Sequence, residues 1–260
     1  VKSKVCSGVC SLERKVFVNL RRRFEDYLYQ QQFTPTHSIS IFYDPGFLIH
    51  LIQFRQIKLD AQTISGSVLD FGCGSKPYEK LFDKADKYTG IDTNSSGHNH
   101  SRSRVDVYYD GSILPFKDSE FDHVAMFDVL EHLDNPEVSL AEIYRVLKPG
   151  GLLIGTVPFC YPLHETPNDY LRYTDYGIDN YLSGKGFAKR SIIRILPGYA
   201  SILQSLIASQ FEGGKVKSQI LKRIFLSPFL FFMNLFGILF LPINQPNSIY
   251  SSHYFVFEKK

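Results

Sequence analysis

The chain has 260 residues, of which 44% are hydrophobic and 21% are charged, and its formal net charge is +3. This composition is typical of a globular protein with a sizeable core, and the small charge argues against nucleic acid as a partner. Four cysteines form no dense framework and the first residues lack a continuous apolar core, so we expect a cytoplasmic protein.

Residues 1–60 are predicted to form a helical segment that leads into a domain spanning 61–260. Apolar residues follow Pro45-Gly46 at helical spacing, from Phe47 to Ile57. This spacing predicts a helix that packs just before the first strand.

From residue 67 onward, the pattern alternates between strands and helices. A helix is expected to begin at 78–82, and an amphipathic helix is expected over 138–147 and to stop at Lys148-Pro-Gly-Gly151. Such alternation predicts a parallel sheet with helices on both faces. The expected strands are 68–71, 87–91, 105–109, 121–129, 152–157, 187–196 and 252–257.

Three acids stand at the ends of the first three strands, where an open α/β sheet binds its ligand. They are Asp70, Asp92 and Asp110. Asp92 lies 20 residues after Gly72, which is the spacing expected of a carboxylate that binds ribose hydroxyls. A single acid at a strand end often only caps a turn, so the argument depends on the three together.

The loop after the first strand reads VLDFGCGSKPY, in which Gly72 and Gly74 let the backbone approach a ligand closely. Pro77 stands where a dinucleotide-binding loop has its third glycine, and proline removes an amide donor that a pyrophosphate needs. A ligand with ribose and adenine but no phosphate tolerates this loss. S-adenosylmethionine is such a ligand, and its sulfonium charge suits a site lined by acids.

Five sequence blocks resemble the class I S-adenosylmethionine-dependent methyltransferases, and specifically their type-11 family. The resemblance implies a Rossmann-like α/β fold with a seven-stranded sheet, helices on both faces and an antiparallel last strand, SHYFVFEK. It also implies that Asp70, Gly72, Gly74 and Phe127 contact the cofactor, with Asp92 on the ribose and Asp110 and Gly111 at the adenine. Lys76 departs from the family, since many members have glycine there. The blocks are VLDFGCGS (68–75), GID (90–92), DGSILPF (110–116), FDHVAMFDVLEHL (121–133) and EIYRVLKPGGLLIGTVP (142–158).

Two histidines are candidate bases for removing a proton from a methyl acceptor. His132 follows the fourth strand and His164 follows the fifth, so both should lie at the ligand-binding edge. The family resemblance allows His132 a purely structural role, because LEHL is common whatever the substrate.

The segment HETPNDYLRYT resembles a segment of methyltransferases from surface-polysaccharide gene clusters. It implies a loop that recognises a sugar, although a lid held by its own hydrogen bonds would have a similar sequence. The candidate acceptor-binding residues are Tyr161, Asp169, Tyr170, Arg172 and Tyr173.

A metal site is the less favoured alternative. Asp128, Glu131, His132 and His164 resemble the metal-binding set of small-RNA 2′-O-methyltransferases, and carboxylates with imidazoles can hold a divalent ion. Because aspartate replaces the first glutamate of that set, the prediction is that no metal is bound.

Residues 224–243 carry no charge and follow Lys222-Arg223. A single membrane crossing would separate the last strand from its sheet, and Pro228 and Pro242 disfavour one uninterrupted helix. The prediction is an apolar helical insertion over about 199–246 that contacts the cytoplasmic face of a membrane through 224–243. A buried helical pair, covering the core or a dimer interface, is the alternative.

These observations predict an S-adenosylmethionine-dependent methyltransferase that acts on a hydroxyl of a sugar or lipid-linked glycan. A quinone or other isoprenoid acceptor is the nearest alternative. The alternative from a different class is a catalytically silent, membrane-docked subunit with a methyltransferase-like fold.

Overall fold

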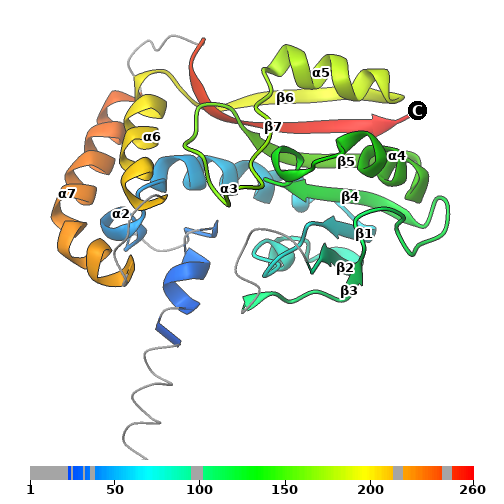
Figure 1. Ribbon diagram of the computed structural model, residues 1–260, viewed down its shortest axis with the longest axis horizontal. Coiled ribbons are helices and arrows are strands. Elements are labelled where there is room, and N and C mark those ends of the chain that lie inside the picture. The colour runs from blue at the N-terminus through cyan, green and yellow to red at the C-terminus, as the bar shows by residue number, and fades with distance from the viewer. Residues whose placement is uncertain are drawn as a thin grey trace, which may run out of the picture.

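A seven-stranded sheet with helices on both faces forms the body of the protein (Figure 1). The computed structural model describes residues 23–24, 26–31, 33–35, 39–94, 102–212, 219–241 and 248–260. Most of the predicted lead-in before residue 39, and residues 213–218 and 242–246 of the predicted insertion, lie outside the described residues.

The strands follow the order β3-β2-β1-β4-β5-β7-β6 across the sheet. The first five strands in this order are parallel to one another, and β7 lies antiparallel between β5 and β6. The predicted Rossmann-like sheet with an antiparallel last strand is therefore confirmed. The strands are β1 (Gly66–Phe71), β2 (Ala85–Thr93), β3 (Val107–Tyr109), β4 (Phe121–Phe127), β5 (Leu147–Pro158), β6 (Phe187–Pro197) and β7 (Tyr250–Lys259).

Helices cover the two faces of the sheet. Successive side chains of β1 point to opposite faces: Leu69 packs in one core with α4 and α5, and Val68 packs in a second core with α3 and the start of α6. Residues 47–61 are thus an integral layer of the fold. The helices are α2 (Ser40–Tyr43), α3 (Phe47–Ala61), α4 (Pro136–Val146), α5 (Asp175–Gly184), α6 (Tyr199–Glu212) and α7 (Gln219–Phe240), with short 3-10 turns η1 (Glu79–Leu81) and η3 (Leu130–His132).

The structure differs from the predicted elements in three places. The helix expected from residue 78 is only the turn η1, because β2 begins at Ala85 and leaves no room for a longer helix. Strand β5 begins directly after α4 and includes the glycine pair that was expected to precede it. Helix α5 was not predicted, although Thr174 caps it by accepting a hydrogen bond from the Gly177 N–H at 2.9 Å.

The insertion between β6 and β7 consists of α6 and α7, which stand side by side at one end of the sheet (Figure 1). Helix α6 begins two residues after β6, which runs parallel to β5, so the helical pair rises from the edge where the parallel strands end. None of the helices in the described ranges is long and apolar enough to cross a membrane.

Buried amides attach this helical pair to the body. Asn234 of α7 donates to the carbonyls of Ile41 and Asp44 at 2.8 and 3.0 Å, and it accepts from Gln204 of α6 at 2.7 Å. Gln204 in turn accepts from the Leu48 N–H at 3.3 Å. Because buried polar groups must be paired, this network specifies which side of α7 faces the body.

We expect Asn234→Ala to lower the free energy of unfolding by about 2–4 kcal/mol, because the Ile41 carbonyl and the Gln204 amide lose this partner and the Asp44 carbonyl keeps only the Phe47 N–H at 3.3 Å. Chemical denaturation monitored by circular dichroism measures this change. Phe225→Ala on the opposite, exposed side of α7 is the matched control, and it should change stability by less than about 0.5 kcal/mol. Equal losses in the two variants would contradict this role for Asn234.

Candidate active site

A cavity of about 490 Å³ opens at the carboxyl ends of the central strands. Its size lies in the range of about 300–1,000 Å³ that is typical of small-molecule sites. The predicted residues that line it are Asp70, Gly72, Gly74, Asp92, Phe127, His132, Tyr161 and His164, together with Asp128 and Glu131 of the metal alternative.

The glycine loop forms one wall of the cavity. Gly72 has φ +72°, and a Cβ atom there would lie 2.5 Å from the Val129 side chain, so only glycine fits. The Gly74 N–H donates to the Asp92 carboxylate at 3.0 Å. Asp92 therefore fixes the loop and stands in the same cavity wall.

Lys76 has a structural explanation in this loop. Its backbone is left-handed, with φ +54°, and its side chain is buried and paired with Asp106. Asp106 also accepts from the Gly90 N–H at 2.7 Å, and the Lys76 ammonium holds the pKa of this carboxyl below its usual value, although partial burial opposes the effect. The lysine thus ties the loop to β2 and to the chain entering β3, where a glycine would leave the loop without this contact.

Asp70 lies buried at the end of β1, where it accepts a hydrogen bond from the Tyr88 hydroxyl at 2.8 Å. Burial raises the pKa of its carboxyl to about 7, against the opposing effects of Tyr88 and Lys76. A neighbouring positive charge on a ligand would favour the ionised form.

We expect the binding of S-adenosylhomocysteine to weaken by up to about eightfold between pH 7.5 and pH 6, because the ligand's ammonium favours ionised Asp70. Calorimetry at several pH values measures this. Asp70→Asn should flatten the dependence. It should also stabilise the ligand-free protein at about pH 8, because a raised carboxyl pKa means that this residue's contribution to stability is lost as the pH rises from about 4 through 7. An equally steep pH dependence in the variant would contradict the assignment.

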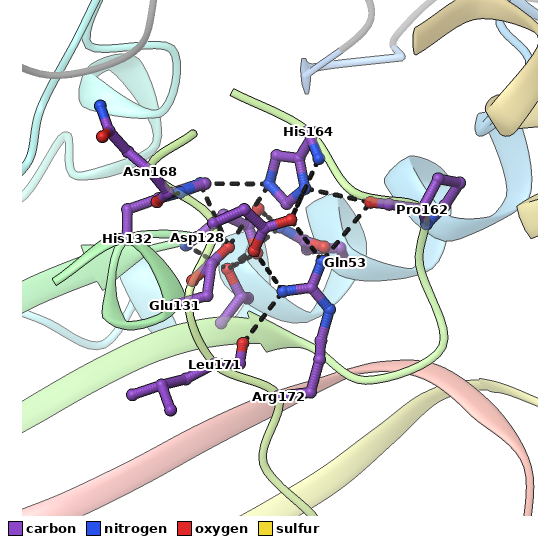
Figure 2. Close-up of polar contacts among 11 residues, drawn as sticks. Gln53, Asp128, Glu131, His132, Pro162, His164, Asn168, Leu171 and Arg172 are labelled. Carbon is purple, nitrogen blue, oxygen red and sulfur yellow. Dashed lines mark hydrogen bonds and ion pairs between the residues drawn. The ribbon is translucent and has the colours of Figure 1, made fainter. Parts of the chain in front are cut away.

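Glu131, His132 and His164 meet on another part of the cavity wall (Figure 2). The two histidine Nε2 atoms lie 3.1 Å apart, and a carboxylate oxygen of Glu131 lies 3.7 Å from each. Burial raises the pKa of Glu131. Burial would lower the pKa of His164, but the facing Glu131 carboxylate outweighs this effect and raises it to about 9.

The loop after β5 holds His164 in place. Asp169 accepts from the His164 backbone N–H at 3.0 Å and forms an ion pair with Arg172. The backbone carbonyl of Glu131 accepts from the Tyr170 N–H at 2.9 Å, which ties the loop to the turn η3. Tyr173 packs parallel to Tyr181 of α5. Of the five predicted acceptor-binding residues, only Tyr161 lines the cavity, and the prediction for the others stays untested.

Asp128 stands apart from this cluster. Its carboxylate accepts from Gln53 at 2.9 Å and from the Thr156 hydroxyl at 2.8 Å. The predicted adenine contacts, Asp110 and Gly111, are both exposed and lie outside the cavity lining, with Asp110 accepting from Ser112.

Several cavity residues were missed by the sequence analysis because they come from distant segments. Gln53 and His50 belong to α3, more than 70 residues before Asp128, and no local motif marks them. The Arg102 guanidinium pairs with Asp26 at 2.8 Å and lies over the Tyr29 ring, which brings part of the N-terminal segment onto the cavity.

The sheet order, the glycine loop and the acid at the end of β2 together define a class I methyltransferase fold. Residues 69–155 match a family described as a methyltransferase domain, so this part of the chain is an S-adenosylmethionine-dependent methyltransferase domain. S-adenosylmethionine is accordingly its cofactor, and Asp92 and the glycine loop are the groups that fit it.

Comparisons with known proteins agree with this class. A ubiquinone/menaquinone biosynthesis C-methyltransferase of Psychromonas ingrahamii is 32% identical over 108 residues, which cover 38% of this chain and 42% of that protein. A fatty-acid O-methyltransferase of Mycolicibacterium smegmatis is 36% identical over 98 residues, covering 34% and 36%. The chain spans about half the length of the first curated relatives it matches, 54% and 42%.

A similar fold occurs in the crystal structure of the cyclase SpnF, with a TM-score of 0.50, 21% identity and coverage of 79% of this chain and 80% of that one. At this identity the likeness concerns the fold alone. A shared fold does not establish a shared reaction, so the activity must be argued from the site.

Proposed function

We propose that the protein transfers the methyl group of S-adenosylmethionine to a hydroxyl oxygen of a sugar or lipid-linked glycan. The observation that carries this proposal is one cavity with two kinds of wall: the glycine loop with Asp92, and the cluster of Glu131, His132 and His164. The first suits the cofactor, and the second suits activation of an acceptor oxygen.

Methyl transfer is an in-line displacement, so much of the rate comes from holding the two reactants in line. The acceptor oxygen attacks the methyl carbon, the carbon–sulfur bond breaks, and its electron pair stays on sulfur as a neutral thioether. The acceptor proton must leave, and an imidazole beside the buried Glu131 carboxylate is suited to promote its loss.

Polar groups on the cavity wall support a polyhydroxylated acceptor. Glu165, Ser251 and Ser252 line the cavity beside Tyr161, and together they offer several hydrogen-bonding groups to an acceptor. A quinone-type acceptor is the second candidate. It is supported by apolar lining residues, Phe33, Ile49 and Phe127, and by the name of the Psychromonas relative.

We further propose that the exposed side of α7 rests on a membrane surface, which would bring a lipid-linked acceptor to the cavity. Apolar residues recur on this side at intervals of three and four residues, which form one stripe on a helix. Phe225 is 85% exposed and Phe232 is 65% exposed. Phenylalanine side chains on a helix next to Lys222-Arg223 suit the boundary of an anionic bilayer. The stripe consists of Phe225, Phe229, Phe232, Phe236 and Leu239.

Flotation with phosphatidylglycerol-containing vesicles tests the membrane proposal. Combining Phe225→Ser, Phe229→Ser and Phe232→Ser should reduce the bound fraction at least about tenfold. Ile113→Ser with Tyr176→Ser removes comparable exposed apolar groups elsewhere and should leave binding unchanged. Equal flotation of the two variants would overturn the proposal. So would a dimer that forms without lipid and that the triple variant converts to a monomer, because a second copy of the chain would then cover the exposed side of α7.

Incubation with methyl-tritiated S-adenosylmethionine tests the reaction. The acceptor source is a glycolipid extract of cells that lack the gene, and we expect label in a sugar that retains it after mild alkaline and acid hydrolysis, as a methyl ether does. Label in the quinone fraction would support the second candidate instead. Binding of S-adenosylhomocysteine without transfer to any fraction would identify a catalytically silent subunit.

A further inference from the structure

The tautomers of His132 and His164 follow from their backbone contacts. The Nδ1 atom of His132 lies 2.8 Å from the carbonyl oxygen of Asn168, and Nδ1 of His164 lies 3.3 Å from the carbonyl oxygen of Pro162 (Figure 2). A carbonyl can only accept, so each Nδ1 carries the proton. In the neutral rings, both Nε2 atoms therefore present lone pairs.

These two lone pairs face each other and the Glu131 carboxylate. The separations are 3.1 Å between the Nε2 atoms and 3.7 Å from Glu131 to each. Glu131 is fully buried, and within the described ranges neither of its carboxylate oxygens has a hydrogen-bond partner. Three electron-pair donors thus converge, an arrangement that is costly unless a cation sits among them. A proton on one Nε2 atom can bridge the two rings, but it leaves Glu131 3.7 Å away, beyond hydrogen-bond distance.

We propose that Glu131, His132 and His164 bind a divalent transition-metal ion. Ligand atoms that lie about 2.0–2.2 Å from a metal, at angles between 90° and 120°, are separated by about 2.8–3.8 Å, and the observed separations of 3.1 and 3.7 Å lie within this range. Two imidazoles and one carboxylate suit Fe²⁺, Zn²⁺ or Mn²⁺, and a set of three protein ligands leaves positions for a substrate.

The surroundings of the cluster agree with a metal site. Histidine ligands usually donate their other N–H to a carboxylate or carbonyl, which orients the ring. His132 does so to Asn168, and His164 has both Pro162 and, at 3.3 Å, the buried Asp169 carboxylate beside its Nδ1. Asp128 is engaged with Gln53 and Thr156 and is not part of the set.

The role of the ion in the reaction depends on the proposed function. All three ligands line the same cavity as the glycine loop and Asp92, so an open coordination position on the ion would face the acceptor. With both Nε2 lone pairs on the ion, the ion replaces the imidazole as the group that promotes loss of the acceptor proton: a hydroxyl bound to it loses its proton to solvent more readily. The resulting alkoxide attacks the methyl carbon as the carbon–sulfur bond breaks. Binding of the ion itself requires no turnover and is measured separately.

Titration of the chelator-treated full chain with Co²⁺, followed by visible absorption and by calorimetry with Zn²⁺ and Mn²⁺, tests the proposal. We expect one equivalent to bind, and we expect Glu131→Gln and His164→Gln each to weaken binding at least about 30-fold. His123→Gln, which alters a histidine outside the cavity, should bind the metal as the wild type does.

Binding of S-adenosylhomocysteine by each variant shows that it is folded. Metal binding with no methyl transfer would leave this inference standing while the proposed function fails. Two results would overturn the inference: no stoichiometric uptake at about millimolar metal, or undiminished uptake in folded Glu131→Gln and His164→Gln. The first would mean that the cluster holds a proton on His164 instead.

Discussion

We expect Asp92→Ala to weaken the binding of S-adenosylhomocysteine by about 100-fold. A carboxylate that accepts hydrogen bonds from two ribose hydroxyls contributes about 1.5–3 kcal/mol for each, and the loss of both, at the lower end of this range, corresponds to a factor of about 100. The variant also removes the hydrogen bond that the Gly74 N–H donates to Asp92 at 3.0 Å, so the glycine loop loses a constraint as well.

Isothermal titration calorimetry with the full chain measures this effect. Asp86, which is exposed near the amino end of the same strand, provides the matched control, and Asp86→Asn should bind the ligand as the wild type does. An affinity for Asp92→Ala within about threefold of the wild type, in a folded protein, would place the ribose elsewhere.

The sheet was predictable because its signals are local. Apolar runs separated by turn residues mark the strands, and the alternation with helices implies parallel pairing. The antiparallel direction of β7 came from the family resemblance, and its position between β5 and β6 was not predicted, since periodicity alone does not specify strand order. The helix expected at 78–82 was wrong because its apolar residues, Tyr78 and Phe82, pack into the core from a single short turn.

The cofactor wall was predictable for a related reason. Gly72, Gly74 and Asp92 lie at strand ends, and the carboxyl ends of parallel strands meet at one edge. The effect of Lys76 was not predictable, because its partner Asp106 is 30 residues away in a segment with no motif. Lys76 adopts the left-handed backbone that glycine adopts readily, and its buried ammonium fixes the loop through an ion pair.

The opposite wall depends on contacts across the chain. Both histidines were expected at the ligand-binding edge, but their approach to 3.1 Å follows from the path of the loop after β5. That path is held by the Asp169–Arg172 ion pair, so two residues predicted to bind the acceptor contact His164 or each other in the structure. Gln53, from α3, carries no sequence signal of its place beside Asp128.

Glu131→Gln should reduce the rate of methyl transfer at saturating substrate by at least about 100-fold, while the affinity for S-adenosylhomocysteine stays within about threefold. The substitution keeps the side-chain volume, but it replaces a carboxylate oxygen with an amide that donates hydrogen bonds. This amide faces the two Nε2 atoms and would occupy the lone pairs that a proton or a metal ion needs. Loss of a positioned base alone costs about 10²–10⁴ in rate.

Tritium transfer to the acceptor fraction labelled by the wild type measures this prediction. Glu137→Gln provides the matched control, since Glu137 is exposed on α4 and lies outside the cavity lining. If Glu131 were only structural, its variant would unfold at a lower temperature while the folded fraction kept its turnover rate. A fall in turnover with unchanged cofactor affinity therefore separates a chemical role from a structural one. The reason is that Glu131 is not among the residues proposed to bind the cofactor, the glycine loop and Asp92, although all of them line one cavity.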